Sequence, residues 1–213
     1  MNPTPAPPPD KTKSKWTWAH TAGSFALLAA IVLVGLGTPA WDRIWVWLTI
    51  MLLLLAFALV AGHGVVGRWT GLLIDERNKM SLSRLQMVLW TILILSGFLA
   101  VALVNIRLVP PQPEPLSIHI PQELWLLMGI STTSLVGSPL LKSRKQDREP
   151  EDTERQRTLG LIAKRGVNMN NVQTNGQVVV NARTEDAGWS DLFSGEETGN
   201  AARLDLGKVQ MFY

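Results

Sequence analysis

Long apolar runs alternate with short polar connections along the first part of this chain. Four of these runs carry no Asp, Glu, Lys or Arg, and they cover residues 21–40, 44–62, 85–106 and 124–141. A helix needs about 20 apolar residues to cross the hydrocarbon core, and a charge at its centre costs roughly 2.5–3.5 kcal/mol on insertion scales. The pattern therefore predicts an all-α membrane protein in which residues 21–141 form four transmembrane helices.

The third run begins with a polar motif that recurs near the end of the chain. Ser81 is of the type that caps a helix, because its hydroxyl can accept from N–H groups that a starting helix leaves unbonded. Residues 206–213 repeat residues 82–89 almost position by position, with a tryptophan upstream in each copy. The tryptophans are 120 positions apart and the glutamines 124, so the second copy is longer by four residues. The matching residues are Trp69, Ser81 and Gln86 in the first copy and Trp189, Asp205 and Gln210 in the second.

Two predicted spans separate the copies, so both are expected on the same face of the membrane, as a parallel repeat. Gln86 and Gln210 would then lie at headgroup depth. Two interpretations stay open for them: a polar contact between copies or subunits, and interfacial amides that simply stay hydrated. The second copy stops at Tyr213, where a span is expected. Either the native chain continues into a fifth helix, or the last helix is a short one on the inner surface.

The motif also carries a family resemblance. The pattern S-x-S-x-x-Q-x-x-x-W-T is formed by Ser81, Ser83, Gln86, Trp90 and Thr91, and the next span contains the sequence LMGIS at 127–131. In these features the chain resembles a family of uncharacterised prokaryotic multi-pass membrane proteins. The resemblance covers residues 69–141 and, through the repeat, the tail. It implies a multi-pass membrane fold, and it implies no activity and no ligand.

Loop charges predict the orientation. Lys and Arg are frequent before the first span, between the second and third, and after the fourth, whereas the other two connections carry only Arg43 and Arg107. Basic residues stay on the cytoplasmic side, so both termini are predicted to be cytoplasmic in a cell (inner) membrane. A competing interpretation treats the first apolar run as a signal peptide, although its cleavage site at residues 38–40 is poor.

Composition divides the rest of the chain. Residues 1–20, rich in Pro and then Lys, are predicted to be a disordered basic arm, because they cannot bury enough apolar surface to order. Residues 142–158 mix both charges and predict a charged linker, or a salt-bridged extension of the fourth helix. Residues 159–213 form a predicted cytoplasmic tail, with a short β-hairpin across 170–182 because Asn175-Gly176 favours a tight turn. Residues 142–213 carry eleven basic and eleven acidic residues, so nucleic acid is a poor candidate partner.

No catalytic constellation is visible in the sequence. The chain has no Cys, and its histidines lie far apart, at span ends or in a loop, so we expect no metal site at His20, His63 or His119. No Walker loop, nucleophile elbow or pair of intramembrane carboxylates is present. The spans also lack the ionisable residues that ion-coupled transporters use. We therefore expect neither an enzyme nor a cofactor.

The fourth span is richer in small and hydroxyl residues than the others. Small residues at every fourth position predict a face on which another helix can approach closely: Gly129, Thr133 and Gly137. A neighbouring face carries hydroxyls that could line a water-filled path if several copies met around an axis: Ser131, Ser134 and Ser138. The alternative is ordinary helix packing, with the hydroxyls bonded to carbonyls of their own helix.

Two functional hypotheses follow. In the first, the protein is an integral membrane anchor or scaffold that self-associates through its fourth span and presents residues 142–213 to a cytoplasmic protein partner. In the second, it is an oligomeric, channel-like pore lined by the fourth span and gated by the tail. Both hypotheses place a homo-oligomer in the lipid bilayer, and both leave the partner and the stoichiometry open.

Overall fold

The chain folds as two compact units. The structure, a computed structural model, describes residues 15–37, 41–108, 114–146, 152–164, 172–175 and 177–212. The helix unit consists of Lys15–Leu72 and Ser83–Gly137, and the tail unit joins Leu73–Leu82 to the described part of Ser138–Tyr213. The tail unit therefore includes a short piece of the connection between two long helices.

The long helices follow the apolar runs of the sequence. They are α1 (Trp18–Gly37), α2 (Arg43–Val66), α3 (Leu82–Arg107) and α4 (Gln122–Gln146). Among the described residues, α1, α2 and α3 are long and apolar enough to cross a membrane. Helix α4 does not belong to this set, because hydroxyl residues dilute its apolar run and its last turns are basic. Three membrane-length helices are thus established, and the fourth span stays a prediction.

The helices extend beyond the apolar runs at their ends. Helix α1 already includes Trp18 and His20, which the sequence assigned to the N-terminal arm, and α2 continues through His63 to Val66. Backbone hydrogen bonding does not stop where apolar side chains stop, so a helix ends at its capping signal instead. For α2 that signal is Gly67, whose φ of 79° is left-handed and whose N–H donates to the His63 carbonyl at 2.8 Å.

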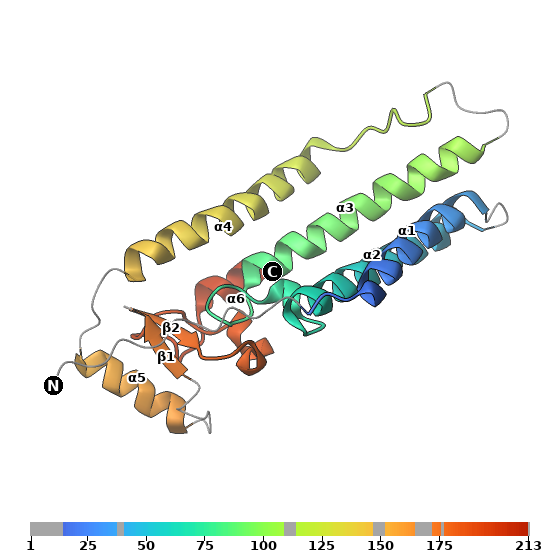
Figure 1. The fold of residues 1–213 in the computed structure, drawn as a ribbon. Helices are drawn as coiled ribbons and strands as arrows, with labels where there is room; N and C mark the ends of the chain where they lie inside the picture. Colours follow the sequence, from blue (N-terminus) through green and yellow to red (C-terminus); the bar gives the residue numbers. More distant parts are fainter. Residues whose placement is uncertain are drawn as a thin grey trace. The chain divides into compact units, whose positions relative to one another are not determined.

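Helices α1, α2 and α3 share one apolar core. Its fully buried members come from all three helices: Ile31, Val46, Ile50, Leu54, Ala100 and Val104. Figure 1 shows α1 and α2 side by side, as expected for helices joined by a tight connection. The indole N–H of Trp47 donates to Ser96 Oγ at 3.0 Å and so links α2 to α3. Large apolar side chains such as Leu33 and Leu52 remain exposed on the outer surface, which is the surface that lipid would cover.

The tail unit contains the predicted hairpin. Strands β1 (Val172–Asn175) and β2 (Val178–Asn181) are antiparallel, with Val172 opposite Asn181 and Asn175 opposite Val178 (Figure 1). This confirms the hairpin expected across 170–182. An isolated hairpin is marginal in water, so it needs a further surface to pack against.

Other segments of the tail unit supply that surface. Helix α5 (Asp152–Lys164) contributes Ile162 to a small core with both strands and the segment before the last helix, formed by Ile162, Val172, Val179, Ala201 and Ala202. The Val179 N–H donates to the Glu196 carbonyl at 3.0 Å, which adds a third segment beside β2. The segment predicted as a charged linker over 142–158 holds the end of α4 and the start of α5, and residues 147–151 lie outside the described residues.

Both copies of the sequence repeat adopt the same local arrangement. A short 3₁₀ helix comes first, Gly71–Leu73 in one copy and Trp189–Leu192 in the other. A β-bridge follows, Ile74 with Met80 or Ser194 with Leu204, and then a helix, α3 or α6 (Leu206–Phe212). The bridge encloses residues 75–79 in the first copy and 195–203 in the second, so the four extra residues lie in this loop.

Candidate functional site

A buried arginine joins the two parts of the tail unit. The Arg77 side chain is 2% exposed, and its Nη2 lies 2.7 Å from Asp75 Oδ2 and 3.1 Å from Glu196 Oε1. Its Nε donates to Asp75 Oδ2 at 2.8 Å, and its backbone N–H donates to Asp75 Oδ1 at 2.9 Å. A guanidinium is tolerated in such a position only when carboxylates neutralise it. The pair with Glu196 therefore ties the connection before α3 to a segment 119 residues further along the chain.

Two asparagines next to this ion pair bond each other reciprocally. The Asn78 Nδ2 donates to the Asn181 carbonyl at 2.8 Å, and the Asn181 Nδ2 donates to the Asn78 carbonyl at 2.9 Å. The Asn181 backbone N–H also donates to the Arg77 carbonyl at 2.9 Å. Asn78 has a φ of 56°, a left-handed conformation that asparagine tolerates better than most residues. The end of β2 is thus fastened to the loop before α3 by three hydrogen bonds.

The Glu196 carboxylate also holds the last helix. Lys208 Nζ lies 3.0 Å from Glu196 Oε1 and donates to the Ser194 carbonyl at 2.8 Å. Asp205 precedes α6 and caps it, since its Oδ1 accepts from the Gly207 and Lys208 N–H groups at 3.0 Å and 3.3 Å. The charges of Arg77, Glu196 and Lys208 therefore form one network that unites the loop, the tail and α6.

A cavity of about 560 Å³ lies beside this network, within the tail unit. Its walls combine apolar side chains from α5, the hairpin and the second repeat copy with a few polar groups. The apolar members are Ile162, Val172, Val179, Phe193, Ala201, Ala202 and Leu204, and the polar ones include Lys79, Asn181, Asp186, Ser190, Asp191 and Arg203. Mixed walls of this kind are typical of sites that hold an apolar body with one polar end.

Lys79 is the notable polar group of this cavity. It is 8% exposed, and its backbone N–H donates to Asp75 Oδ1 at 3.4 Å. Burial lowers the pKa of the Lys79 ammonium below its ordinary value, and the Asp191 carboxylate offsets part of this shift. Asp191 is itself engaged, because its Oδ2 accepts from the Gly188 and Met80 N–H groups at 2.9 Å and 3.3 Å. The cavity thus offers a buried cation to an incoming carboxylate or carbonyl oxygen.

Replacing Lys79 by methionine is expected to stabilise the tail unit by about 1 kcal/mol at pH 7, because a buried charge is replaced by an apolar chain of similar length. The pKa of Lys79 is lower in the folded chain than in the unfolded one, so between the two values the unfolded chain binds more protons and stability rises with pH. The wild-type chain therefore becomes more stable as the pH rises. The stabilisation that Lys79→Met adds should shrink as the pH approaches 10.5, the ordinary pKa of lysine.

Denaturant unfolding of the detergent-solubilised chain at pH 7 and pH 10 measures this difference. Lys164→Met, at the exposed end of α5, is the matched control and should change stability little at either pH. A destabilising Lys79→Met, or a gain that grows with pH, would contradict the assignment of Lys79 as a buried, weakly solvated cation.

The residues predicted on the fourth span lie on a largely exposed helix. A Cβ added to Gly129 or Gly137 meets no atom within 4 Å, so the predicted packing face is open in the single chain. The hydroxyls of Thr132 and Thr133 donate to the carbonyls of Met128 and Gly129, both at 2.8 Å, as in ordinary helix packing. Ser131 is buried, and the side chains of Ser134 and Ser138 lie outside the described residues.

The residues of the repeat motif take corresponding places in the two copies. Ser81 immediately precedes α3 and its N–H donates to the Leu73 carbonyl at 2.8 Å; the Asp205 N–H donates to the Phe193 carbonyl, also at 2.8 Å. Trp69 and Trp189 are both exposed at the start of their copies. Gln86 is half-buried in α3 and Gln210 is exposed on α6, and the polar contact between them stays a prediction.

The structure brings together two histidines that the sequence analysis treated as far apart. His20 Nε2 lies 2.9 Å from His63 Nδ1, and the His63 ring packs against Trp69 with the ring centroids 4.5 Å apart. The contact arises because His20 lies in the first turn of α1 and His63 in the last turn of α2, so two antiparallel helices place them at one end. The sequence could have indicated this contact, because the first two predicted spans are antiparallel neighbours and the start of one lies beside the end of the other. No group of three or more metal-ligating side chains occurs among the described residues.

The buried network around Arg77 was missed at the level of sequence, where these residues look like part of a polar loop. The sequence signal that could have found it is the pair of acidic residues that follows the tryptophan in each repeat copy, among them Asp75 and Glu196. Comparison with protein-family models, with curated proteins and with solved structures finds no match for this chain.

Proposed function

We propose that this protein is an integral membrane scaffold that presents its tail unit to a cytoplasmic protein partner. In this proposal α1 to α4 all cross the inner membrane, both termini are cytoplasmic, and the open face of α4 at Gly129, Thr133 and Gly137 mediates self-association. The three membrane-length helices and the exposed apolar surface support the anchoring part. The orientation rests on the distribution of Lys and Arg among the connections.

The observation that carries the presenting part is the burial of Arg77 between Asp75 and Glu196. A tail that only linked or anchored the chain would need no such contact with the connection before α3. The ion pairs make the tail part of a folded unit, and a folded unit can hold the walls of a cavity in place. We therefore expect the partner to be recognised by this unit rather than by an extended tail segment.

The cavity defines the chemistry of that partner. Lys79 contributes a cation to its wall, which also carries Arg203, the carboxylates of Asp186 and Asp191, and a set of apolar side chains. An acidic side chain or a terminal carboxylate with apolar neighbours satisfies both features, since the carboxylate neutralises a charge that is otherwise costly to bury. The partner is therefore a protein that inserts such an acidic segment.

A photo-crosslinking amino acid at Ser190, on the cavity wall, tests this proposal in intact membranes. The expected result is one covalent protein adduct whose crosslinked peptide contains Asp, Glu or a C-terminus. Lys79→Met should reduce the adduct at least tenfold although it stabilises the unit, because it removes the counter-charge of the ligand. Arg183→Gln, an exposed cation outside the cavity wall, is the matched control and should leave the adduct unchanged.

Two results would count against the proposal. Equal adduct yields from the wild-type chain and from the Lys79→Met variant would show that the cavity cation is not the contact. A crosslinked peptide without any carboxylate would remove the acidic partner, even if an adduct forms.

A further inference from the structure

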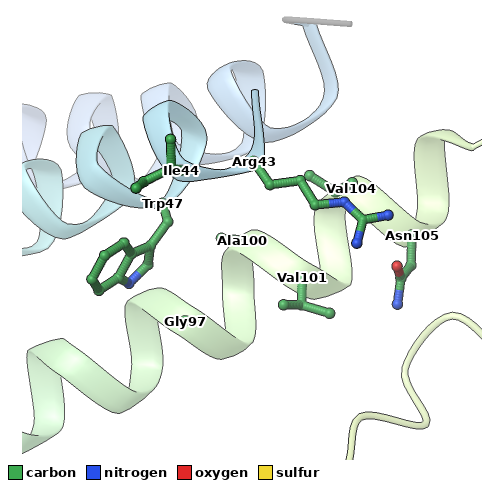
Figure 2. A pocket seen from close by; sticks show the side chains of 8 residues that line it. All are labelled: Arg43, Ile44, Trp47, Gly97, Ala100, Val101, Val104 and Asn105. Carbon is green, nitrogen blue, oxygen red and sulfur yellow. The ribbon is translucent and has the colours of Figure 1, made fainter. Parts of the chain in front are cut away.

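Two cavities meet at one end of the helix unit. The first, of about 300 Å³, lies between the beginning of α2 and the second half of α3. Figure 2 shows its lining residues: Arg43, Ile44, Trp47, Gly97, Ala100, Val101, Val104 and Asn105. The second, of about 390 Å³, is lined by Leu36, Trp41, Asp42, Arg43, Val104, Arg107 and Leu108. Both cavities are lined by Arg43 and Val104, so they adjoin at these residues, and we call the two together the hollow.

The two parts of this hollow differ in chemistry. The first is apolar along its length, with the Trp47 ring beside Gly97 and with Arg43 and Asn105 towards its other end (Figure 2). The second gathers charged groups, two guanidiniums from Arg43 and Arg107 and the single carboxylate of Asp42. The hollow therefore runs from an apolar groove to a pocket with an excess of positive charge.

The sequence explains why these groups lie together. Arg43 is the first residue of α2 and Arg107 is the last residue of α3, so both arginines stand where a membrane-length helix ends. Arg107 Nη1 donates to the Gly35 carbonyl at 3.4 Å, which holds it beside the end of α1. Exposed tryptophans, Trp41 and Trp45, flank the same end, as is typical of the membrane–water interface.

The apolar groove is shaped by fixed elements. Gly97 has no side chain, and a Cβ added there would first meet Trp47 Nε1 at 3.9 Å, so the glycine leaves the groove open. The Trp47 indole is held in place by its hydrogen bond to Ser96 Oγ at 3.0 Å, and Ser96 Oγ in turn donates to the Leu93 carbonyl at 2.9 Å. The groove is therefore a preformed feature of the α2–α3 contact.

We propose that an anionic phospholipid occupies this hollow, with its phosphate between Arg43 and Arg107 and one acyl chain along Trp47, Gly97 and Val101. The proposal rests on the proposed insertion of α1, α2 and α3 into the bilayer. Guanidinium and phosphate match in charge and geometry, and basic pockets between membrane helices are known to hold lipid headgroups. An acyl chain fills the adjoining groove, which would otherwise expose apolar surface to a void.

Charge selects the anionic lipid over a zwitterionic one. Two arginines against one carboxylate leave one positive charge in the pocket. A lipid with an uncharged polar headgroup, such as phosphatidylglycerol, brings one negative charge and cancels it. Phosphatidylcholine brings no net charge, so it leaves the excess uncompensated.

Native mass spectrometry of the full-length chain in detergent, titrated with phosphatidylglycerol or phosphatidylcholine, tests the proposal. The wild-type chain should retain one phosphatidylglycerol with about tenfold higher affinity than phosphatidylcholine, since a charge-assisted hydrogen bond contributes about 1.5 kcal/mol or more. Arg43→Gln should remove this preference. Arg43 lines both cavities, so the substitution acts within the proposed site.

Three further variants separate the parts of the site. Gly97→Leu fills the groove and should weaken phosphatidylglycerol retention about tenfold. Arg43→Lys keeps the charge and should restore most of the preference that Arg43→Gln loses. Gly23→Leu on α1 is the matched control for the added side chain, because a Cβ there meets no atom within 4 Å, and it should leave retention unchanged.

Specific outcomes would overturn the proposal. Equal retention of the two lipids by the wild-type chain would remove the charge selectivity. Displacement of the lipid by millimolar inorganic phosphate, together with normal binding by Gly97→Leu, would reduce the hollow to an anion site without an acyl chain. A failure of membrane insertion itself would appear separately, as chain released from membranes by carbonate extraction, and would overturn the proposed function as well.

Discussion

Alanine in place of Arg77 is expected to destabilise the tail unit by about 3–5 kcal/mol, because it removes the buried guanidinium that pairs with both Asp75 and Glu196 and leaves Glu196 its ion pair with Lys208. The guanidinium also fills a fully buried position, so its removal opens a cavity in addition. Small folded units have a stability of about 5–15 kcal/mol, so the loss is a large part of the total. The tail unit should come apart while α1, α2 and α3 remain helical.

Hydrogen exchange of backbone amides measures this effect directly. The N–H of Asn181, bonded to the Arg77 carbonyl, and the N–H of Val179, bonded to the Glu196 carbonyl, report the two sides of the contact. Both should lose protection in Arg77→Ala. Arg183→Ala is the matched control, because Arg183 is 61% exposed and its ion pairs with Glu185 and Asp186 are long, at 3.6 Å and 3.8 Å.

The control should change stability by less than about 1 kcal/mol, as exposed ion pairs do. Retained protection at Asn181 and Val179 in Arg77→Ala would mean that the loop and the tail are not held together by this arginine. It would also remove the observation on which the proposed presentation of the tail unit rests.

Alanine in place of Gly71 is expected to destabilise the end of α2 by about 1–3 kcal/mol, the usual range for forcing extra volume into a packed site. A Cβ on Gly71 would overlap the Gly62 carbonyl oxygen and would come within 2.9 Å of Val66 Cβ. Backbone atoms cannot rotate away as a side chain can, so the turn that follows α2 must shift. The shift should carry Trp69 away from His63, whose rings now lie 4.5 Å apart.

Thermal unfolding followed by near-UV circular dichroism should show a lower midpoint and a reduced tryptophan signal in Gly71→Ala. Gly23→Ala in α1 is the matched control, because it adds the same methyl group where no atom lies within 4 Å. A helix normally gains from glycine to alanine, so the control should be neutral or slightly more stable. An unchanged unfolding midpoint in Gly71→Ala would show that the turn at Gly71 has room for a methyl group beside α2.

Features with short-range causes could be predicted from the sequence. Uncharged runs of sufficient length indicated α1, α2 and α3, because lipid demands apolar side chains and satisfied backbone groups over the whole crossing. The Asn175-Gly176 pair indicated the hairpin, since a tight turn depends on the residues within it. The repeat was visible as a pattern, and even its four-residue difference corresponds to one loop.

Contacts between distant parts of the chain could not be predicted in this way. Arg77 looked like one of several loop cations, and nothing in its neighbourhood distinguishes a solvated arginine from a buried one. Its role depends on Glu196, which is 119 residues away, so only the folded chain can bring the two together. The same applies to His20 and His63, which became neighbours once α1 and α2 paired.

The sequence by itself determined that long helices suited to lipid alternate with polar segments, and that a motif before α3 recurs before α6. Only the tertiary structure decided that the connection before α3 and the tail form one unit, with a cavity at Lys79 and an ion pair at Arg77. The physical reason is the range of the interactions. Burial in lipid and turn formation act on neighbouring residues, whereas a buried charge is stable only if its counter-charge, from anywhere in the chain, arrives at the same place.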